Sequence, residues 1–329
     1  MQEIIKIDMP QDVVEIIQGL CSHGFAAYAV GGCVRDTLLG VEPKDWDITT
    51  SASPVQVKEI FGHTLDTGIE HGTVTIMRGK IGYEVTTYRI DGKYSDGRHP
   101  DQVKFTPNLF EDLRRRDFTI NAMAYSDEMG LVDEFCGMED LEKKVVRCVG
   151  EAKERFQEDA LRMLRAIRFS AQLGFTIESD TWQAMIQMAK NLSLVSKERI
   201  LVELTKTICS SHPEMVKKIF DSGLHKEIGQ HFSSLSARDA EVMAFSGQLP
   251  EEKHLRFALL FKNKSGEEAK AILRELKADN DTIKKVKILV EYIDRKLPRN
   301  EKRMRQALSE IGPERVRDWI LLKKVLGEE

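Results

Sequence analysis

Hydrophobic and polar positions follow two different patterns in two parts of the chain. Up to about residue 140, short runs rich in β-branched residues alternate with turns. The runs 73–79 and 83–90, separated by glycines, predict a β-hairpin. Helices are predicted at about 10–22 and 33–40. This mixture of strands and helices predicts an α+β fold for the first part.

After about residue 140, apolar residues recur at helical spacing. The segment 151–174 predicts one long amphipathic helix, and its apolar positions are Phe156, Leu161, Leu164, Ile167 and Phe169. The segments 181–192, 197–208 and 213–224 continue the pattern, and no further strand is predicted. We therefore expect the downstream half to be all-helical.

Composition narrows the class of protein. A length of 329 residues favours two or more domains. With 41% hydrophobic and 31% charged residues, the chain is typical of globular proteins with a sizeable core. A net charge of −4 does not indicate a nucleic-acid binder, so any polyanion must meet local basic patches.

Five scattered cysteines without a CxxC pair predict reduced thiols and argue against structural zinc. The N-terminus lacks the pattern of a signal peptide, and no apolar run reaches the roughly 18 residues of a membrane span. We therefore expect a cytoplasmic protein without a membrane partner.

The stretch AVGGCVRDTLLGVEPKDWDITT, residues 29–50, carries the first candidate chemistry. Gly31 and Gly32 precede a predicted helix, where free backbone N–H groups can hold a phosphate at the positive helix end. Arg35 adds positive charge one turn later. The alternative for Arg35 is a salt bridge with Asp36 or another carboxylate.

Asp45 and Asp47 lie one residue apart in a strand-like run of the same stretch. Side chains alternate faces in a strand, so both carboxylates are expected on one face. Two adjacent carboxylates repel each other unless a cation lies between them, and Mg²⁺ accepts such oxygen ligands. The stretch therefore predicts a nucleoside triphosphate site that uses Mg²⁺, as in two-metal phosphoryl transfer.

At this point a family resemblance emerges. GGCVRDTLLG followed by DWDITT resembles the head motif of class II tRNA nucleotidyltransferases, the CCA-adding enzymes, whose close relatives are bacterial poly(A) polymerases. The resemblance continues over roughly 200 residues through YEVTTYRIDGKYSDGRHP, LRRRDFTINAMAY and RFQEDALRMLRAIRFSAQLGF.

The resemblance implies a polymerase-β-like nucleotidyltransferase head with a small mixed sheet, followed by an all-helical neck, body and tail. We place the head at 1–140, the neck at 141–205, the body at 206–290 and the tail at 291–329.

The resemblance also implies roles for residues of the head. Asp45 and Asp47 would hold the metal ions, and Glu84, on the neighbouring predicted strand, could complete the acidic cluster or be a surface residue. Gly32 and Arg35 would face the triphosphate.

In LRRRDFTINAMAY, Arg116 would reach the nucleotide, and Asp117 would lie near the ribose and accept its 2′-hydroxyl. Asn121, Ala122 and Met123 are expected to be packing and turn residues. The polar segment 89–100 predicts a loop, which in the family takes part in the switch from C to A addition.

The segment EDALRMLRAIRF suggests a protein template for a base. Asp159 and Arg162 are three residues apart and would share one helix face, with Arg165 and Arg168 continuing the row. The alternative is a charged helix face with local ion pairs. Arg165 and Arg168 would lie along the phosphates or brace Asp159.

A carboxylate only accepts hydrogen bonds and a guanidinium only donates them. Cytosine and adenine offer an amino donor beside a ring-nitrogen acceptor and match this pair. Uracil and guanine present the reverse order, which would cost about 1–3 kcal/mol for each mispaired group. The pair therefore predicts acceptance of CTP and ATP and rejection of UTP and GTP.

Downstream, Lys262 and Asn263 stand where some relatives carry the His-Asp of a phosphohydrolase, so no such activity is expected. The basic tail is the candidate for gripping the tRNA, through Arg295, Lys296, Arg299, Lys302, Arg303 and Arg305. The alternative is a solvated helix face.

The sequence thus predicts template-independent addition of C, C and A to the 3′ end of tRNA from CTP and ATP, with recognition of the acceptor stem. Alternatives within the class are an A-adding-only or CC-adding-only enzyme and a poly(A) polymerase. A different class would be an inactive RNA-binding module. The oligomeric state stays open.

Overall fold

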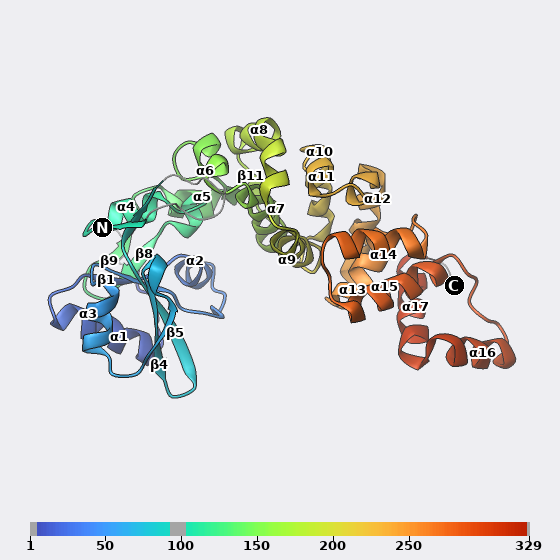
Figure 1. The fold of residues 1–329 in the computed structure, drawn as a ribbon, viewed down its shortest axis with the longest axis horizontal. Helices are drawn as coiled ribbons and strands as arrows, with labels where there is room; N and C mark the ends of the chain where they lie inside the picture. Colours follow the sequence, from blue (N-terminus) through green and yellow to red (C-terminus); the bar gives the residue numbers. More distant parts are fainter. Residues whose placement is uncertain (1–4, 93–102, 328–329) are drawn as a thin grey trace. The chain divides into compact units, whose positions relative to one another are not determined.

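The computed structural model describes residues 5–92 and 103–327, and the chain divides into two compact units (Figure 1). Residues 1–159 form a unit of strands and helices, and residues 160–329 form an almost entirely helical unit. The expected α+β head and helical downstream half are confirmed. The finer division into head, neck, body and tail stays a prediction.

A mixed sheet organises the first unit. Within its described residues, seven strands pair in the order β3-β4-β5-β2-β1-β8-β9. Strands β2 and β5 run parallel, and the other neighbours run antiparallel. The strands are β1 (Ala27–Val30), β2 (Ile48–Thr50), β3 (Thr64–Gly68), β4 (Thr73–Arg78), β5 (Ile81–Thr87), β8 (Ala124–Ser126) and β9 (Gly130–Val132).

The predicted hairpin is confirmed as β4 and β5, whose turn places Gly79 at a φ of +62°, where glycine avoids the clash of a side chain. The segment 89–100 departs from the prediction of a loop. Its first residues form β6 (Arg89–Asp91), which pairs with β7 (Val103–Phe105), because the backbone of 89–91 finds ladder partners there. Residues 93–100 lie outside the described part.

Helices surround the sheet of the first unit. Helix α1 (Gln11–Ser22) buries Val13, Ile16, Ile17 and Leu20 at helical spacing, as predicted. Helix α2 (Gly32–Leu38) follows β1 directly and places the glycine pair beside the sheet. The remaining helical elements are α3 (Pro54–Ile60), η1 (Ile69–His71), α4 (Leu109–Arg114), η2 (Thr119–Asn121), α5 (Gly137–Lys143) and α6 (Ala152–Glu158).

The second unit is built from packed helices. They are α7 (Leu161–Leu173), α8 (Ser179–Met188), η3 (Ala189–Leu194), α9 (Lys197–Ile208), η4 (Pro213–Val216), α10 (Lys217–Asp221), α11 (His225–Ile228), η5 (Phe232–Ser234), α12 (Ala237–Glu241), η6 (Val242–Gln248), α13 (Lys253–Leu260), α14 (Gly266–Glu275), α15 (Asn280–Ile293), α16 (Glu301–Ile311) and α17 (Pro313–Val325). Two short strands, β10 (Val145–Val146) in the first unit and β11 (Thr176–Ile177) in the second, correct the expectation that no strand follows residue 140.

The segment 151–174 is not one helix. Helix α6 ends at Glu158, Asp159 is extended with φ −142° and ψ 103°, and α7 begins at Leu161. The break falls where the chain passes from the first unit to the second. Apolar periodicity reports which side chains are buried, and it does not report whether the backbone is continuous. The prediction that Asp159 and Arg162 share one helix face is therefore wrong.

Candidate active site

The two predicted metal-binding aspartates lie directly before β2, in an irregular segment rather than inside the strand. The carbonyl of Asp47 accepts the N–H of Val30 at 3.0 Å, which ties the segment to β1. Alternation along a strand therefore does not place the carboxylates. They lie at the N-terminal end of β2, an interior strand of the sheet that begins at the next residue, Ile48.

A pocket of about 190 Å³ opens beside this segment. It is lined by Val30, Asp47, Ile48, Thr73, Glu84, Thr86, Arg89, Arg115 and Arg116. Glu84 reaches it because β5 is the parallel neighbour of β2, with Ile48 paired to Val85. The structure thus brings Asp47 and Glu84 into one pocket, with Arg116 beside them. Asp45 lines a different hollow, together with Glu42 and Trp46.

Negative charge concentrates around Asp47. Desolvation by the surrounding protein atoms raises the pKa of the Asp47 carboxyl, although the residue retains access to solvent. Glu84 and Asp45 raise this pKa further, while the Arg116 guanidinium lowers it. A site where carboxylates oppose one another's ionisation favours a bound cation.

The oxygen donors of Asp45, Asp47 and Glu84 fit a hard divalent cation such as Mg²⁺. Among the described residues, however, no three Asp, Glu, His or Cys side chains are arranged to hold a metal by themselves. Mg²⁺ commonly takes one or two carboxylates and completes its shell with water and substrate phosphates. The residues present therefore fit a cation that binds together with the triphosphate.

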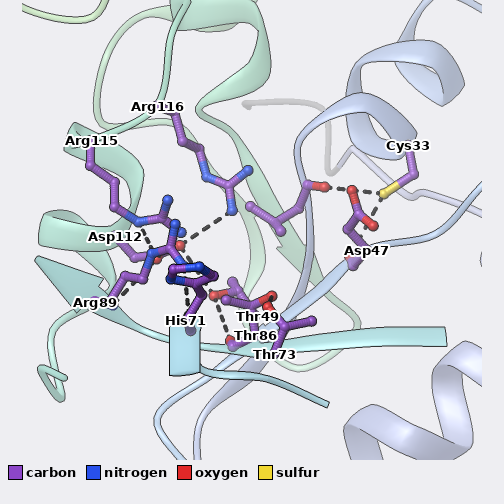
Figure 2. Close-up of polar contacts among 11 residues, drawn as sticks. Cys33, Asp47, Thr49, His71, Thr73, Thr86, Arg89, Asp112, Arg115 and Arg116 are labelled. Atoms are coloured by element: carbon purple, nitrogen blue, oxygen red, sulfur yellow. Dashed lines mark hydrogen bonds and ion pairs between the residues drawn. The ribbon is translucent and has the colours of Figure 1, made fainter. Parts of the chain in front are cut away.

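A buried carboxylate that the sequence analysis missed organises the arginines of this pocket (Figure 2). Asp112, on α4, is fully buried and lies 2.8 Å from Arg115 Nη2 and 3.2 Å from Arg116 Nη2. It also accepts a hydrogen bond from the Thr49 hydroxyl at 3.1 Å and one from the backbone N–H of Arg89 at 3.4 Å.

Burial alone would raise the pKa of Asp112, but the guanidinium groups of Arg115 and Arg116 outweigh it and lower this pKa. The carboxylate is therefore ionised and fixes both arginines. Its spacing of three and four residues from them on one helical turn was the available signal.

The glycine pair and Arg116 lie together. Gly31, with φ +83°, precedes α2, and a Cβ there would lie 3.1 Å from Arg116 Nη1. A side chain at this position would be strained by its backbone and would crowd the arginine. Gly32 begins α2, and a Cβ on it would lie 3.7 Å from Arg35 Nη2.

Arg35 is buried and forms the salt bridge with Asp36 that was the alternative to a contact with the triphosphate. Its Nη2 lies 2.6 Å from Asp36, and its Nη1 donates to Asn121 Oδ1 at 2.5 Å. Asn121 Nδ2 donates in turn to Asp117 at 3.1 Å. Asn121 lies in η2, as expected of a turn residue, but it also links Arg35 to Asp117, a role that its sequence context did not reveal.

The predicted base-reading residues lie at the start of α7. Asp159 follows α6 as an extended residue, and Arg162 lies in the first turn of α7. Arg165 contacts the ring of Phe169, with 5.5 Å from its Cζ to the ring centroid. Arg168 Nε lies 2.6 Å from Glu203 Oε2, and both side chains are buried. Arg168 therefore links α7 to Glu203 of α9, and its predicted place along the phosphates or against Asp159 stays a prediction.

All six basic residues predicted to hold tRNA are exposed, from Arg295 to Arg305. Arg295 lies over the ring of Tyr292 at 3.9 Å, and Arg305 pairs with Glu301 at 2.6 Å. Their contact with RNA stays a prediction.

No helix of the described residues has both the length and the apolar character needed to cross a membrane.

Comparison with known proteins decides the family. Residues 27–147 match the model of the poly A polymerase head domain, and 174–234 match a probable RNA and SrmB-binding site of polymerase A. The CCA-adding enzyme of Pediococcus pentosaceus is 39% identical over 328 residues, covering 97% of this chain and 81% of that protein. The chain belongs to the CCA-adding enzyme family.

Solved structures of the family agree. The Bacillus stearothermophilus CCA-adding enzyme in complex with CTP has a TM-score of 0.83 and 34% identity, over 96% of this chain and 78% of that one. Among relatives compared by sequence, the CCA-adding enzyme of Leuconostoc mesenteroides is 50% identical over 206 residues. That match covers 62% of this chain and about half of the relative, 51%.

Proposed function

We propose that this protein adds C, C and A to the 3′ end of tRNA from CTP and ATP, releasing pyrophosphate at each step. The observation that carries the proposal is the pocket in which Asp47 and Glu84 face Arg115 and Arg116, in a chain of the CCA-adding family. Carboxylates on one side and guanidinium groups on the other match a metal-bound triphosphate.

In this proposal the 3′-hydroxyl of the tRNA attacks the α-phosphate of the bound nucleotide, and the pyrophosphate leaves. Arg115 and Arg116, held by Asp112, stabilise the negative charge of the phosphates. Gly31 leaves room for Arg116, and Arg35 supports the same region through Asn121. Asp117 accepts a hydroxyl of the ribose.

CCA-adding enzymes generally use a divalent metal, and we assign Mg²⁺ to Asp45 and Asp47, with Glu84 beside them. When bound, such a cation activates the attacking hydroxyl and neutralises the leaving phosphates. The protein's own contribution is to gather the carboxylates; desolvation raises the pKa of Asp47 most, and Glu84 and Asp45 raise it further.

Base selection is assigned to Asp159 and Arg162 by hydrogen-bond chemistry. An acceptor beside a donor matches the Watson–Crick edges of cytosine and adenine and opposes those of uracil and guanine. The break before α7 leaves Asp159 outside a helix, so its carboxylate is not confined to a helix face. The exposed basic residues from Arg295 to Arg305 are assigned to tRNA phosphates.

Three tRNA transcripts, ending at the discriminator base, at C and at CC, test this function. Each is incubated with the protein, Mg²⁺ and labelled CTP, ATP or both. Growth to CCA on all three is the expected result. Extension of only the CC-ended transcript, with ATP alone, would mean an A-adding enzyme, and extension of none would contradict the proposal.

A further inference from the structure

A second hollow, of about 500 Å³, lies in the helical unit and takes no part in the site described above. It is lined by Arg238, Glu241, Val242, Phe245, Lys262, Asn263, Val325 and Leu326. These residues come from α12, η6, the turn after α13 and the end of α17. Lys262 and Asn263 stand where the sequence analysis considered a hydrolase metal motif and found none.

An aromatic ring is presented to solvent in this hollow. Phe245 is 59% exposed, whereas the neighbouring Val242 is buried and forms part of the floor. Exposing a phenyl ring costs hydrophobic free energy that burial would have gained. A ring held open beside a hollow is the arrangement on which nucleic-acid bases stack.

Two cations stand on the rim. Within the described residues, the side chains of Arg238 and Lys262 form no hydrogen bond or ion pair. The carboxylate of the rim is already matched, because Glu241 lies 3.6 Å from Lys217 Nζ. Asn263 is also engaged, since its Nδ2 donates to Asp239 at 3.0 Å. The hollow therefore presents unmatched positive charge beside an exposed ring.

We propose that this hollow binds an unpaired nucleotide of the RNA substrate, with its base on Phe245 and its phosphate between Arg238 and Lys262. The inference rests on the proposed function, which supplies RNA as the partner. An aromatic platform flanked by cations is the general solution for single-stranded nucleic acid, because every base has a stacking face and every nucleotide a phosphate.

The test is equilibrium binding of a labelled tRNA transcript between about 50 and 200 mM salt. Phe245→Ala is expected to weaken binding at least about 5-fold without changing the salt slope, since stacking carries no charge. Phe245→Trp should retain wild-type affinity. The double variant Arg238→Ala/Lys262→Ala should weaken binding and reduce the slope by about 1 to 2.

Two matched controls separate this site from general surface effects. Met129→Ala removes another apolar side chain that is 65% exposed, and Lys284→Ala removes an exposed lysine of α15. Both should bind tRNA as the wild type does. Thermal melting of every variant, with KM for CTP and ATP, completes the comparison.

Wild-type tRNA affinity in Phe245→Ala would overturn the proposal. If that variant instead lost thermal stability at unchanged affinity, a protein segment would be the occupant, and a changed KM for CTP or ATP alone would indicate a free nucleotide. Either result also contradicts the proposal. Failure of the wild type to extend any transcript would refute the proposed function separately, because binding is measured without catalysis.

Discussion

Two buried carboxylates hold arginines in the two units, and they do so differently. Asp112 in the first unit contacts both Arg115 and Arg116, and the same arginines line the pocket with Asp47. Glu203 in the second unit pairs with Arg168, whose guanidinium also lies 4.0 Å from the centre of the Phe169 ring. One carboxylate is shared by two cations at a hollow, and the other closes an interface between α7 and α9.

The comparison shows that an arginine-rich motif alone does not distinguish arginines that line a ligand pocket from arginines that join packed helices. Arg116 and Arg168 were both predicted to contact the nucleotide, and each lies in an arginine-rich motif. What differs is where the buried acid lies. Asp112 contacts two guanidinium groups that line the pocket with Asp47, whereas Glu203 contacts a guanidinium group between two packed helices.

The largest expected effect comes from the pocket itself. Asp47→Asn keeps the shape of the side chain but removes the charge that holds the cation, so the rate of nucleotide addition should fall roughly 10³-fold or more. Single-turnover addition of labelled CTP to tRNA measures it. Met129→Ala serves as the exposed control in the same unit. Activity of Asp47→Asn within twofold of wild type would remove Asp47 from the chemistry.

A pair of variants tests the comparison directly. Asp112→Asn and Glu203→Gln each break a buried ion pair and should each lose about 3 kcal/mol of stability. Only Asp112→Asn should raise the KM for CTP, by about 10-fold or more, because charged hydrogen bonds to two pocket arginines are lost. Denaturant unfolding and steady-state kinetics give the two readouts. An equal rise in KM for Glu203→Gln would place Arg168 in the nucleotide site.

A smaller effect concerns stability and pH. The folded-state pKa of Asp47 is raised, so the folded protein binds this proton more tightly than the unfolded chain does. Stability therefore falls as pH rises from the unfolded pKa through the folded one, and ionised Asp47 is destabilising at neutral pH. Without divalent cations, Asp47→Asn should melt slightly above the wild type at pH 7.

Adding Mg²⁺ and CTP should raise the melting temperature of the wild type more than that of Asp47→Asn, since a ligand stabilises the state that binds it. At a pH below the unfolded pKa of aspartate the difference without cations should vanish. If Asp47→Asn melted below the wild type at neutral pH without cations, the ionised Asp47 carboxylate would not destabilise the folded protein, contrary to the prediction.

The sequence was sufficient for the features that local patterns encode, namely α1, the β4–β5 hairpin and the helical second unit. The family resemblance added the mixed sheet of the first unit. Residue chemistry and the resemblance together selected Asp47, Glu84 and Arg116, which the structure gathers in one pocket. Glycine positions and β-branched runs carry such information because they act on the backbone within a few residues.

The features that the sequence did not predict depend on contacts between residues far apart in the chain. In the sequence, Asp112 looks like an exposed acidic residue on a helix. Its burial and its hydrogen bonds with Thr49 and the backbone of Arg89 make it the centre of a network. Asn121 bridges residues far apart in the chain. The helix break at Asp159 coincides with a boundary between units, which periodicity does not mark.

The most direct measurement compares Asp47→Asn with Asp159→Ala on a discriminator-ended and a CC-ended tRNA, each offered the four nucleoside triphosphates singly. The account predicts that Asp47→Asn slows CTP addition to the first transcript and ATP addition to the second alike, and gains no new substrate. Asp159→Ala should still transfer nucleotides but should discriminate against UTP and GTP about 5-fold to 100-fold less than the wild type. Strict rejection of UTP and GTP by Asp159→Ala would contradict the separation of chemistry from base selection.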